Sequence, residues 1–369
     1  MASNIIQKSY KFRIFPSKAQ TTKLEYTLDL CRELYNAALQ ERRDAYKLNR
    51  ISISKDTQEK QLPELKKIRT DLNNVYAQVL QDVIKRVDRS FQNFFRRVKT
   101  KKGKAGFPRF QGKFRYNSFT FKQGGFKVEN SKLVLSKIGK VKIKLHREIV
   151  GKVKTLTIRR DSCGKWFACF SVECEKEILK PNSKSVGVDC GIKTFAVLSD
   201  GTEIANPRFF EQDQKRLAKA SCKLSATPKQ SKERHKKRKV VARIHSKIKN
   251  RRSDFAHKLS RILVNKYQNI FFEKLNIKGM MEQNFLNKQI SDAAWNQLIN
   301  FSIYKAENAG RNCKLINPQF TSQDCSGCGH RQKMPLDIRL YDCPECHISI
   351  DRDLNASLNI LSIGLNAIG

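Results

Sequence analysis

The spacing of hydrophobic residues along the first hundred positions predicts one strand and a helical module. Residues 10–14 alternate between polar and apolar side chains, as a short strand does. Ser17 then has the character of a helix cap, with Gln20 three residues later completing a capping box. Beyond it, apolar residues recur at intervals of three and four, which predicts helices over 17–98.

From residue 107 to 175 the apolar spacing changes to two, which is typical of β-strands. Apolar residues alternate with lysines over 140–145. The segments 153–158 and 166–172 flank a turn-forming stretch, 161–165, and so predict a hairpin. These features favour a β-barrel or sandwich with one basic face.

The remaining residues combine short apolar strands with long helical patterns. The predicted strands are 185–189, 195–198, 270–273 and 314–316. A very basic helical segment over 212–266 is expected to divide at Pro228, and Gly310 is expected to end a helix that begins near 293. Mixed strands and helices of this kind predict an α/β sheet domain.

The charge of the chain limits the classes of partner. The 369 residues include 74 Lys and Arg against 34 Asp and Glu, a formal net charge of +40. Repulsion among so many positive charges favours a polyanionic partner, and a long nucleic acid fits better than an anionic membrane surface. No run approaches the ~20 apolar residues that a membrane span needs, and the first ten residues lack the apolar core of a signal peptide.

Four of the eleven cysteines have the spacing of a metal site. Cys325 and Cys328 form one CxxC pair, and Cys343 and Cys346 form a second after a gap of fourteen residues. Two such pairs supply the four thiolates of a tetrahedral Zn²⁺ site, and closed sites of this type are structural. We therefore expect one structural zinc ion, with the nearby histidines solvated and the other seven cysteines as ordinary thiols.

Three acidic residues are candidates for a catalytic metal site. Asp189 and Glu273 each end an apolar strand, and Asp353 begins the last helix. Carboxylates from different segments can hold two Mg²⁺ ions, which activate water and stabilise the leaving oxygen in phosphodiester hydrolysis. Gly187 and Gly191 flank the first acid and would let a phosphate backbone approach. Taken singly, each acid has an ordinary structural explanation; together, in so basic a chain, they favour a nuclease.

Basic clusters with interleaved aromatic residues are a further indication of nucleic acid. The clusters comprise Arg86, Arg89, Arg96, Arg97, Lys99, Lys101, Lys102 and Lys104, then 229–239 and 247–252, which includes Arg251 and Arg252. The aromatic residues that could stack with bases are Phe107, Phe110, Phe114, Tyr116 and Phe119. Most of these contacts are expected at phosphates, which carry no sequence information.

These motifs resemble those of TnpB, the family of transposon-associated RNA-guided DNA endonucleases related to type V CRISPR effectors. The resemblance covers nearly the whole chain. It rests on Lys11–Gln20, Cys31–Leu39, Lys104–Phe110, Val186–Gly191, Phe272–Asn276, Thr321–Cys325 and Asp353–Ile360. Cys190 stands where the family usually has an aliphatic residue, and Ser357 where alanine is common. In the last motif the metal-binding acid precedes asparagine by two positions, which assigns metal binding to Asp353 and leaves capping or ion pairing to Asp351.

The resemblance implies a multidomain α+β protein. Its expected parts are 1–16, the first strand of a wedge β-barrel; 17–106, a helical recognition module; 107–180, the wedge β-barrel; 181–320, a RuvC or RNase H-like nuclease domain with a basic helical insertion; 321–349, a zinc-binding module; and 350–369, the third nuclease motif and C-terminal helix.

The resemblance also implies a guide RNA, encoded near the gene, that reads target double-stranded DNA by base pairing. The protein would read only a short flanking DNA motif. Candidate residues for that reading are Tyr76, Gln78, Gln81, Lys85, Asn117 and Ser118. We further expect a monomer in the ribonucleoprotein and a cytoplasmic, nucleoid-associated location in a prokaryote.

Two alternative functions remain open at this stage. RNase H-type acids also serve DNA-joining transposases, which act on transposon ends without RNA. A catalytically silent RNA-binding regulator would keep the basic surfaces and dispense with turnover, although the presence of all three acids argues against it.

Overall fold

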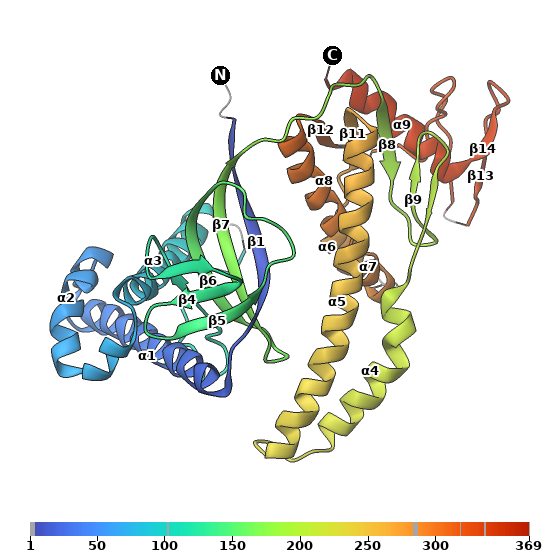
Figure 1. Ribbon diagram of the computed structural model, residues 1–369. Coiled ribbons are helices and arrows are strands. Elements are labelled where there is room, and N and C mark those ends of the chain that lie inside the picture. The colour runs from blue at the N-terminus through green and yellow to red at the C-terminus, as the bar shows by residue number, and fades with distance from the viewer. Residues whose placement is uncertain (1–3, 102, 283–286, 318, 336, 369) are drawn as a thin grey trace. The chain divides into compact units, whose positions relative to one another are not determined.

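The computed structural model describes residues 4–101, 103–282, 287–317, 319–335 and 337–368. The chain divides into two compact units, Met1–Glu175 and Lys176–Gly369 (Figure 1). The first combines helices with an antiparallel sheet, and the second surrounds a mixed sheet with helices. The expected multidomain α+β architecture is confirmed.

The helices of the first unit follow the predicted pattern. α1 (Lys18–Asn49) begins at Ser17, where the capping box with Gln20 is present, and ends at Arg50 in the left-handed conformation. The helical part of the chain after α1 contains α2 (Lys55–Ile68), the 3₁₀ turn η1 (Thr70–Asn74) and α3 (Ala77–Thr100). α1 packs against α3, and α2 packs against α3 as well.

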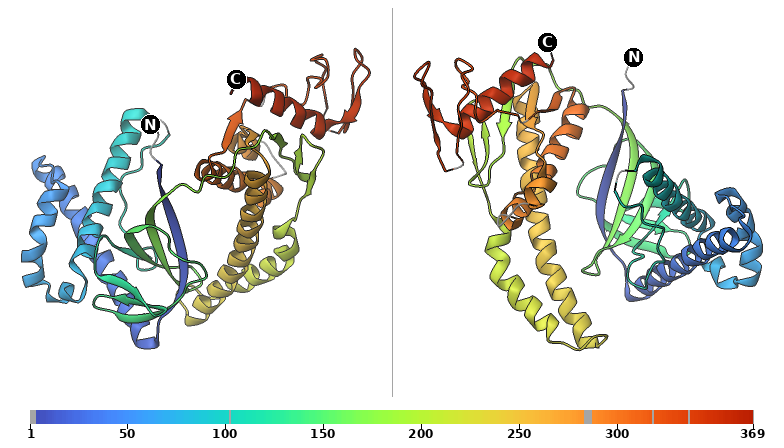
Figure 2. Two further views of the ribbon diagram at one scale, coloured as in Figure 1. Left: turned by 45° about the horizontal axis from the view of Figure 1, so that its top comes forward. Right: turned by 180° about the vertical axis from the view of Figure 1, so that it is seen from behind.

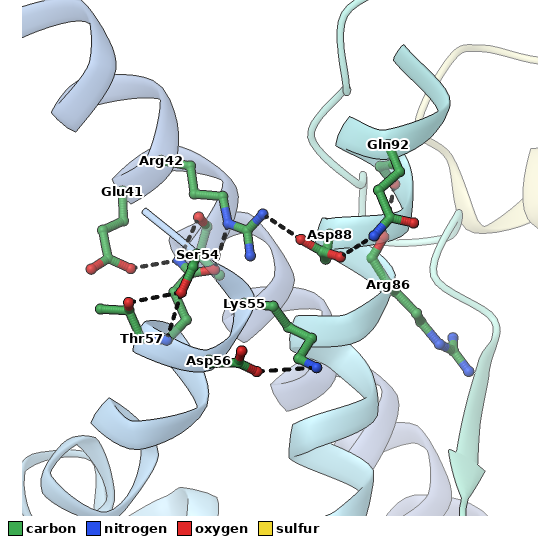
Figure 3. Close-up of polar contacts among 12 residues, drawn as sticks. Glu41, Arg42, Ser54, Lys55, Asp56, Thr57, Arg86, Asp88 and Gln92 are labelled. Carbon is green, nitrogen blue, oxygen red and sulfur yellow. Dashed lines mark hydrogen bonds and ion pairs between the residues drawn. The ribbon is translucent and has the colours of Figure 1, made fainter. Parts of the chain in front are cut away.

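A buried guanidinium joins these three helices. Arg42 of α1 donates from Nε to Gln58 Oε1 of α2 at 2.8 Å and from Nη1 to Asp88 Oδ1 of α3 at 3.0 Å. Gln92 Nε2 donates to the other oxygen of Asp88 at 2.7 Å. Figure 3 shows Arg42 and Asp88 reaching toward each other from neighbouring helices. Because a buried charge is costly unless it is paired, this network fixes how the helices pack.

A seven-stranded antiparallel sheet forms the rest of the first unit. Its strand order is β2-β6-β7-β1-β5-β4-β3, so the N-terminal strand lies at its centre. The bounds are β1 Ile5–Phe15, β2 Ser118–Phe121, β3 Phe126–Glu129, β4 Lys132–Leu135, β5 Gly139–Lys144, β6 Lys152–Arg160 and β7 Trp166–Glu175. The predicted hairpin around 161–165 is β6–β7. Phe12, Phe119, Phe121 and Phe170 are fully buried in its core.

The second unit contains a five-stranded sheet in the order β10-β9-β8-β11-β12. Its strands are β8 Ser185–Asp189, β9 Thr194–Leu198, β10 Glu203–Ala205, β11 Asn269–Glu273 and β12 Asn312–Ile316. β8, β9 and β10 are antiparallel neighbours, whereas β11 runs parallel to both β8 and β12. An antiparallel meander continued by two parallel strands is the RNase H-like arrangement that the sequence predicts.

Helices cover this sheet and extend away from it. α4 (Phe209–Ser225) and α5 (Lys232–Lys266) run side by side as a long hairpin whose connection contains Pro228, as expected (Figure 1). α6 (Ile277–Glu282), α7 (Asn287–Ala293) and α8 (Trp295–Ala309) follow, and Gly310 ends α8 with φ +67°. None of the described helices is long and apolar enough to cross a membrane.

The chain ends in a small ribbon followed by a helix. β13 (Leu340–Asp342) and β14 (Ser349–Asp351) pair antiparallel, and α9 (Arg352–Asn366) follows directly (Figure 2). Cys325, Tyr341 and Cys343 form the buried centre of the ribbon. α9 packs back onto β8 and β11, which brings the end of the chain to the sheet.

Candidate functional site

The first two candidate acids lie at the same edge of the sheet. Asp189 ends β8, and Glu273 ends β11. The two strands are parallel and adjacent, with Val188 paired to Phe272 one residue earlier. Because parallel strands end at a common edge, the carboxylates leave the sheet side by side. Buried apolar residues precede each acid, so the strands fix where both carboxylates begin.

The third candidate acid enters from α9. Asp351 caps this helix, because its Oδ1 accepts the backbone N–H groups of Asp353 at 2.8 Å and Leu354 at 3.0 Å. The capping role assigned to Asp351 is thereby confirmed. Asp353 occupies the first helical turn, and its side chain does not cap the helix. α9 packs on β8, and the charge of Asp353 acts on Asp189 at the end of that strand.

Gly187 serves this packing rather than a phosphate backbone. A Cβ atom at Gly187 would lie 2.1 Å from the carbonyl oxygen of Ser357 and 2.6 Å from the nitrogen of Leu361, both in α9. A Cβ at Gly191 would lie 2.8 Å from the carbonyl oxygen of Thr194, within the tight β8–β9 connection. The expectation that these glycines make room for nucleic acid is therefore wrong for Gly187 and stays a prediction for Gly191. Gly187 makes room for the protein's own backbone.

The three carboxylates influence one another electrostatically. Burial, followed by the negative charges of Glu273 and Asp353, raises the pKa of Asp189 from 3.8 to about 7. Burial also raises the pKa of Glu273, against the effect of a hydrogen bond from Thr321. Carboxylates that repel one another in a partly buried site favour a divalent cation, which would offset both the repulsion and the cost of burial.

Two residues that sequence reasoning missed contact these acids. Thr321 Oγ1 donates to Glu273 Oε1 at 2.8 Å, and the threonine is buried. Arg339, which precedes β13, places Nη1 3.3 Å from Asp353 Oδ2. Neither residue belongs to an acidic motif, and they lie 48 and 14 residues from their partners in the sequence. The arginine brings a positive charge to the edge of the acidic site, where an anionic substrate would arrive.

The four predicted zinc ligands form a closed cluster. Their Sγ atoms all lie within 4.8 Å of one another, with Cys325 and Cys346 3.5 Å apart and Cys328 and Cys343 3.6 Å apart. A tetrahedron with metal–sulfur bonds of about 2.3 Å has edges of about 3.8 Å, and a disulfide would need about 2.05 Å. Among the described residues, this is the one group of three or more His, Cys, Asp or Glu side chains whose ligand atoms all lie this close together, and the three candidate acids are spaced more widely. The geometry therefore suits Zn²⁺.

One cysteine of the cluster is favoured in its thiolate form, whereas the pKa values of Cys328 and Cys346 are raised. Backbone N–H groups, first that of Cys346, lower the pKa of Cys343 to about 6. A thiolate is the form that binds zinc. His330 and His347 stand outside the cluster, as expected.

Hydrogen bonds attach the cysteine module to α9. Asn355 Oδ1 accepts from the N–H of Ser326 at 2.9 Å, and its Nδ2 donates to the carbonyl oxygen of Asp324 at 2.8 Å. Asn359 Nδ2 donates to the carbonyl oxygens of Thr321 and Asp324 at 2.8 and 2.7 Å. Both asparagines are buried. The helix that carries Asp353 is thus fixed to the first CxxC segment.

Three of the six candidate DNA-reading residues already have structural contacts. Gln78 Oε1 accepts the N–H groups of Gln123 and Gly124 at 3.1 and 3.3 Å. The Tyr76 ring lies 5.8 Å from that of Phe121. Ser118 Oγ accepts from Arg86 at 3.3 Å.

The other three candidates make fewer side-chain contacts. Gln81 and Lys85 are one turn apart on α3, and Asn117 lies just before β2. Their side chains have no hydrogen-bond or ion-pair partner in the part of the chain that the structure describes. Base contacts by Gln81, Lys85 and Asn117 therefore stay predictions.

Arg86 does not lie on the exposed basic face where the sequence suggested it. Its guanidinium donates to Asp82 at 2.7 Å, to the carbonyl oxygen of Ser118 at 2.7 Å and to Thr120 Oγ1 at 2.8 Å. It also lies over the ring of buried Tyr116, 5.6 Å from its centroid. This arginine therefore joins α3 to β2. The sequence did not predict this role, because helical spacing alone does not show which basic residue of α3 faces the sheet.

Arg251 and Arg252 both make contacts within the second unit. Arg252 Nη2 lies 2.6 Å from the buried carboxylate of Asp292, and Arg251 Nη1 lies 3.5 Å from that of Asp213. Arg251 also lies over the ring of Phe209, 4.7 Å from its centroid. These pairs hold α5 to its neighbours, and a nucleic-acid contact by either arginine stays a prediction.

The five-stranded sheet has the RNase H-like strand order, and the chain adds to it a module with four clustered cysteines. Three family models match: "Helix-turn-helix domain" over residues 1–50, "Probable transposase" (OrfB_IS605) over 169–284, and "Cas12f1-like, TNB domain" over 295–360. Despite its name, the first model covers a strand, β1, and a single helix, α1.

Full-length relatives establish the family. A Streptomyces pristinaespiralis protein named "Putative RNA-guided DNA endonuclease" is 33% identical, over 98% of this chain and 90% of its own length. InsQ of Escherichia coli K12, named in the same way, is 29% identical over 97% of this chain and 92% of its own length. The chain therefore belongs to the TnpB family, encoded by transposons of the IS605 type.

Solved structures share the fold. The protein in a Cas12f1–sgRNA–target DNA complex matches 97% of this chain and 99% of its own, with a TM-score of 0.59 at 15% identity. CasPhi-2 bound to crRNA and phosphorothioate DNA matches 98% of this chain and 91% of its own, with a TM-score of 0.51 at 9% identity. Both comparisons support the fold alone.

Proposed function

We propose that this protein is an RNA-guided, Mg²⁺-dependent DNA endonuclease of a transposable element. The observation that carries this proposal is that Asp189 and Glu273 end adjacent parallel strands, and that Asp353 of α9 is near enough for its charge to act on Asp189. The names of its full-length relatives and the nucleic acids bound by the Cas12f1 protein support the guided activity. The net charge of +40 supplies the sequence-independent attraction to a polyanion.

In the proposed reaction the three carboxylates would hold two Mg²⁺ ions, which when bound would supply an activated water and stabilise the leaving oxygen. Thr321 keeps the Glu273 carboxylate oriented, since its hydroxyl occupies Oε1 at 2.8 Å. Arg339 pairs with Asp353 before substrate binds and can move its guanidinium to the scissile phosphate, where negative charge develops.

The zinc module has a structural part in this proposal. The cysteine cluster would hold one Zn²⁺. Hydrogen bonds of Asn355 and Asn359 attach this module to the helix that carries Asp353. Four thiolate ligands would leave no coordination position on the zinc for water or substrate, so the zinc would serve folding rather than chemistry.

Guidance and DNA reading complete the proposal. A guide RNA encoded near the gene pairs with one strand of target double-stranded DNA, and one copy of the protein acts in each ribonucleoprotein. Gln81, Lys85 and Asn117 are the proposed readers of a short motif that flanks the target.

The test is expression of the gene beside its native flanking DNA. We expect a defined RNA to co-purify and the particle to cut a plasmid that carries the matching target next to one motif selected from randomised flanks. Asp189→Ala should abolish cutting while the RNA is still bound. Cutting by that variant in Mg²⁺ would refute the site assignment, and a preparation without defined RNA would refute guidance. Joining of transposon ends without RNA would instead establish a transposase.

A further inference from the structure

Five aromatic residues between α3 and β2 or in β2 were candidates for stacking with bases, and the structure separates them. Tyr116 and Phe119 are buried, with 6% and 1% of their surface exposed, so stacking by these two is excluded. Phe107, Phe110 and Phe114 remain 45%, 44% and 63% exposed. Three large exposed rings so close together in the sequence indicate a surface that another molecule covers.

Two of the exposed rings line a cavity of about 360 Å³. Its walls are Leu39 and Arg43 of α1 and the loop residues Phe107, Pro108, Arg109 and Phe110. A volume of this size lies at the lower end for small-molecule sites. The cavity therefore suits one compact planar group better than a length of duplex.

The loop that forms the cavity is held in place from both sides. Asn36 of α1 binds Gln111 twice, accepting its N–H at 2.8 Å and donating to its carbonyl oxygen at 3.0 Å. The Phe107 ring packs edge-on against Phe91 and Phe94 of α3, with centroids 5.6 and 5.4 Å apart. The exposed rings are thus fixed on a supported loop, which lowers the entropic cost of binding.

The charges around the cavity are suited to an anion. The Arg43 guanidinium lies 5.5 Å from the centroid of Phe110, and its 3.7 Å pair with Asp44 is exposed and weak. Arg109 is exposed and has no ion-pair or hydrogen-bond partner within the described residues. The lining contains no acidic side chain. An aromatic plane beside two guanidinium groups matches a base and its phosphate.

We propose that this cavity binds an unpaired nucleotide of single-stranded DNA, with its base stacked on Phe110 and a phosphate paired with Arg109. The lining offers no side-chain amide, hydroxyl or carboxylate that could read a base edge. It would therefore accept any sequence, as a site must for the DNA strand that is released when a guide pairs with the other strand. This proposal rests on the proposed function for the origin of that strand.

The test measures binding of an oligodeoxythymidine of about twelve nucleotides with one central 2-aminopurine. The full-length wild-type protein should quench the fluorescence of the modified base. Phe110→Leu should remove the quenching and weaken binding about tenfold, with the slope of log K against log salt unchanged. Arg109→Gln should instead reduce that slope by about 0.7, the value for one phosphate contact on a single strand. Phe114→Leu, on the same loop but outside the cavity, is the matched control.

Equal affinity and equal quenching for the wild type and Phe110→Leu would overturn the proposal. Tighter binding of an oligouridine with the same dependence on Phe110 and Arg109 would assign the cavity to RNA and overturn the assignment to DNA. The assay needs neither guide RNA nor cleavage, so its failure is distinct from a failure of the plasmid test above.

Discussion

The hydroxyl of Thr321 donates to Glu273 Oε1 at 2.8 Å, which connects the segment before the first CxxC pair to a proposed catalytic acid. The carbonyl oxygen of the same threonine accepts Asn359 Nδ2 of α9 at 2.8 Å. One buried residue therefore joins β11 to the helix that carries Asp353. This relationship gives the cysteine module a physical connection to two of the three acids.

Thr321→Val should reduce cleavage without unfolding the protein. Valine keeps the volume but leaves the Glu273 carboxylate without its donor, so we expect kcat to fall about tenfold and more Mg²⁺ to be required. Titration of Mg²⁺ by calorimetry on the uncleaved complex should show weaker binding. Thr321→Ser, which restores the hydroxyl, should recover most of both properties. Equal Mg²⁺ affinity in the wild type and the valine variant would contradict a positioning role.

Gly187→Ala should destabilise the second unit severely. The new Cβ would lie 2.1 Å from the Ser357 carbonyl oxygen, so α9 must move away from β8. We expect a loss of several kcal/mol in the free energy of unfolding, or failure to fold, measured by chemical denaturation. Gly106→Ala is the matched control, because a Cβ there would meet nothing within 4 Å. A fully stable Gly187→Ala protein would show that α9 does not pack on the sheet in this way.

Local patterns in the sequence anticipate much of this fold. The capping box at Ser17, the turn at 161–165 and the helix end at Gly310 depend on neighbouring residues, and all three are confirmed. Asp189 and Glu273 were identifiable because a charged residue that closes a strongly apolar strand is unusual. The strand pairing that places them side by side follows from the α/β pattern.

Contacts between distant segments could not be predicted in this way. The role of Arg86 in joining α3 to β2 depends on which face of the helix meets the sheet. Arg339 meets Asp353 only because the cysteine ribbon folds back on α9. Gly187 adjoins an acid in the sequence, yet the α9 backbone occupies the space beside it. Tertiary packing decides each of these cases, and no spacing along the chain encodes it.

The raised pKa of Asp189 predicts how the stability of the protein depends on pH. Its folded pKa, about 7, lies above the ordinary value of 3.8, so the folded state binds this proton more tightly than the unfolded state. The resulting stabilisation is complete below the ordinary pKa and is lost as pH rises through about 7. In buffer without Mg²⁺, the melting temperature of the wild type should therefore fall relative to that of Asp189→Asn between pH 5 and pH 8.

The comparison between those two proteins reports on Asp189 and its effect on the neighbouring acids, because groups far from this site are the same in both. Adding Mg²⁺ at pH 8 should raise the melting temperature of the wild type and leave Asp189→Asn nearly unchanged. Parallel melting curves for the two proteins across this pH range would show that Asp189 is not held in a carboxylate cluster.

Loss of the zinc site should impair cleavage through the position of α9. In Cys343→Ser we expect the chain to lose its single zinc ion, measured by plasma mass spectrometry, and to melt at lower temperature, because metal binding contributes folding free energy. Cleavage should fall with stability, since Asn355 and Asn359 attach α9 to the first CxxC segment. Cys222→Ser, at an exposed thiol outside the cluster, should change none of these quantities. A Cys343→Ser protein without zinc but with wild-type stability would contradict this account.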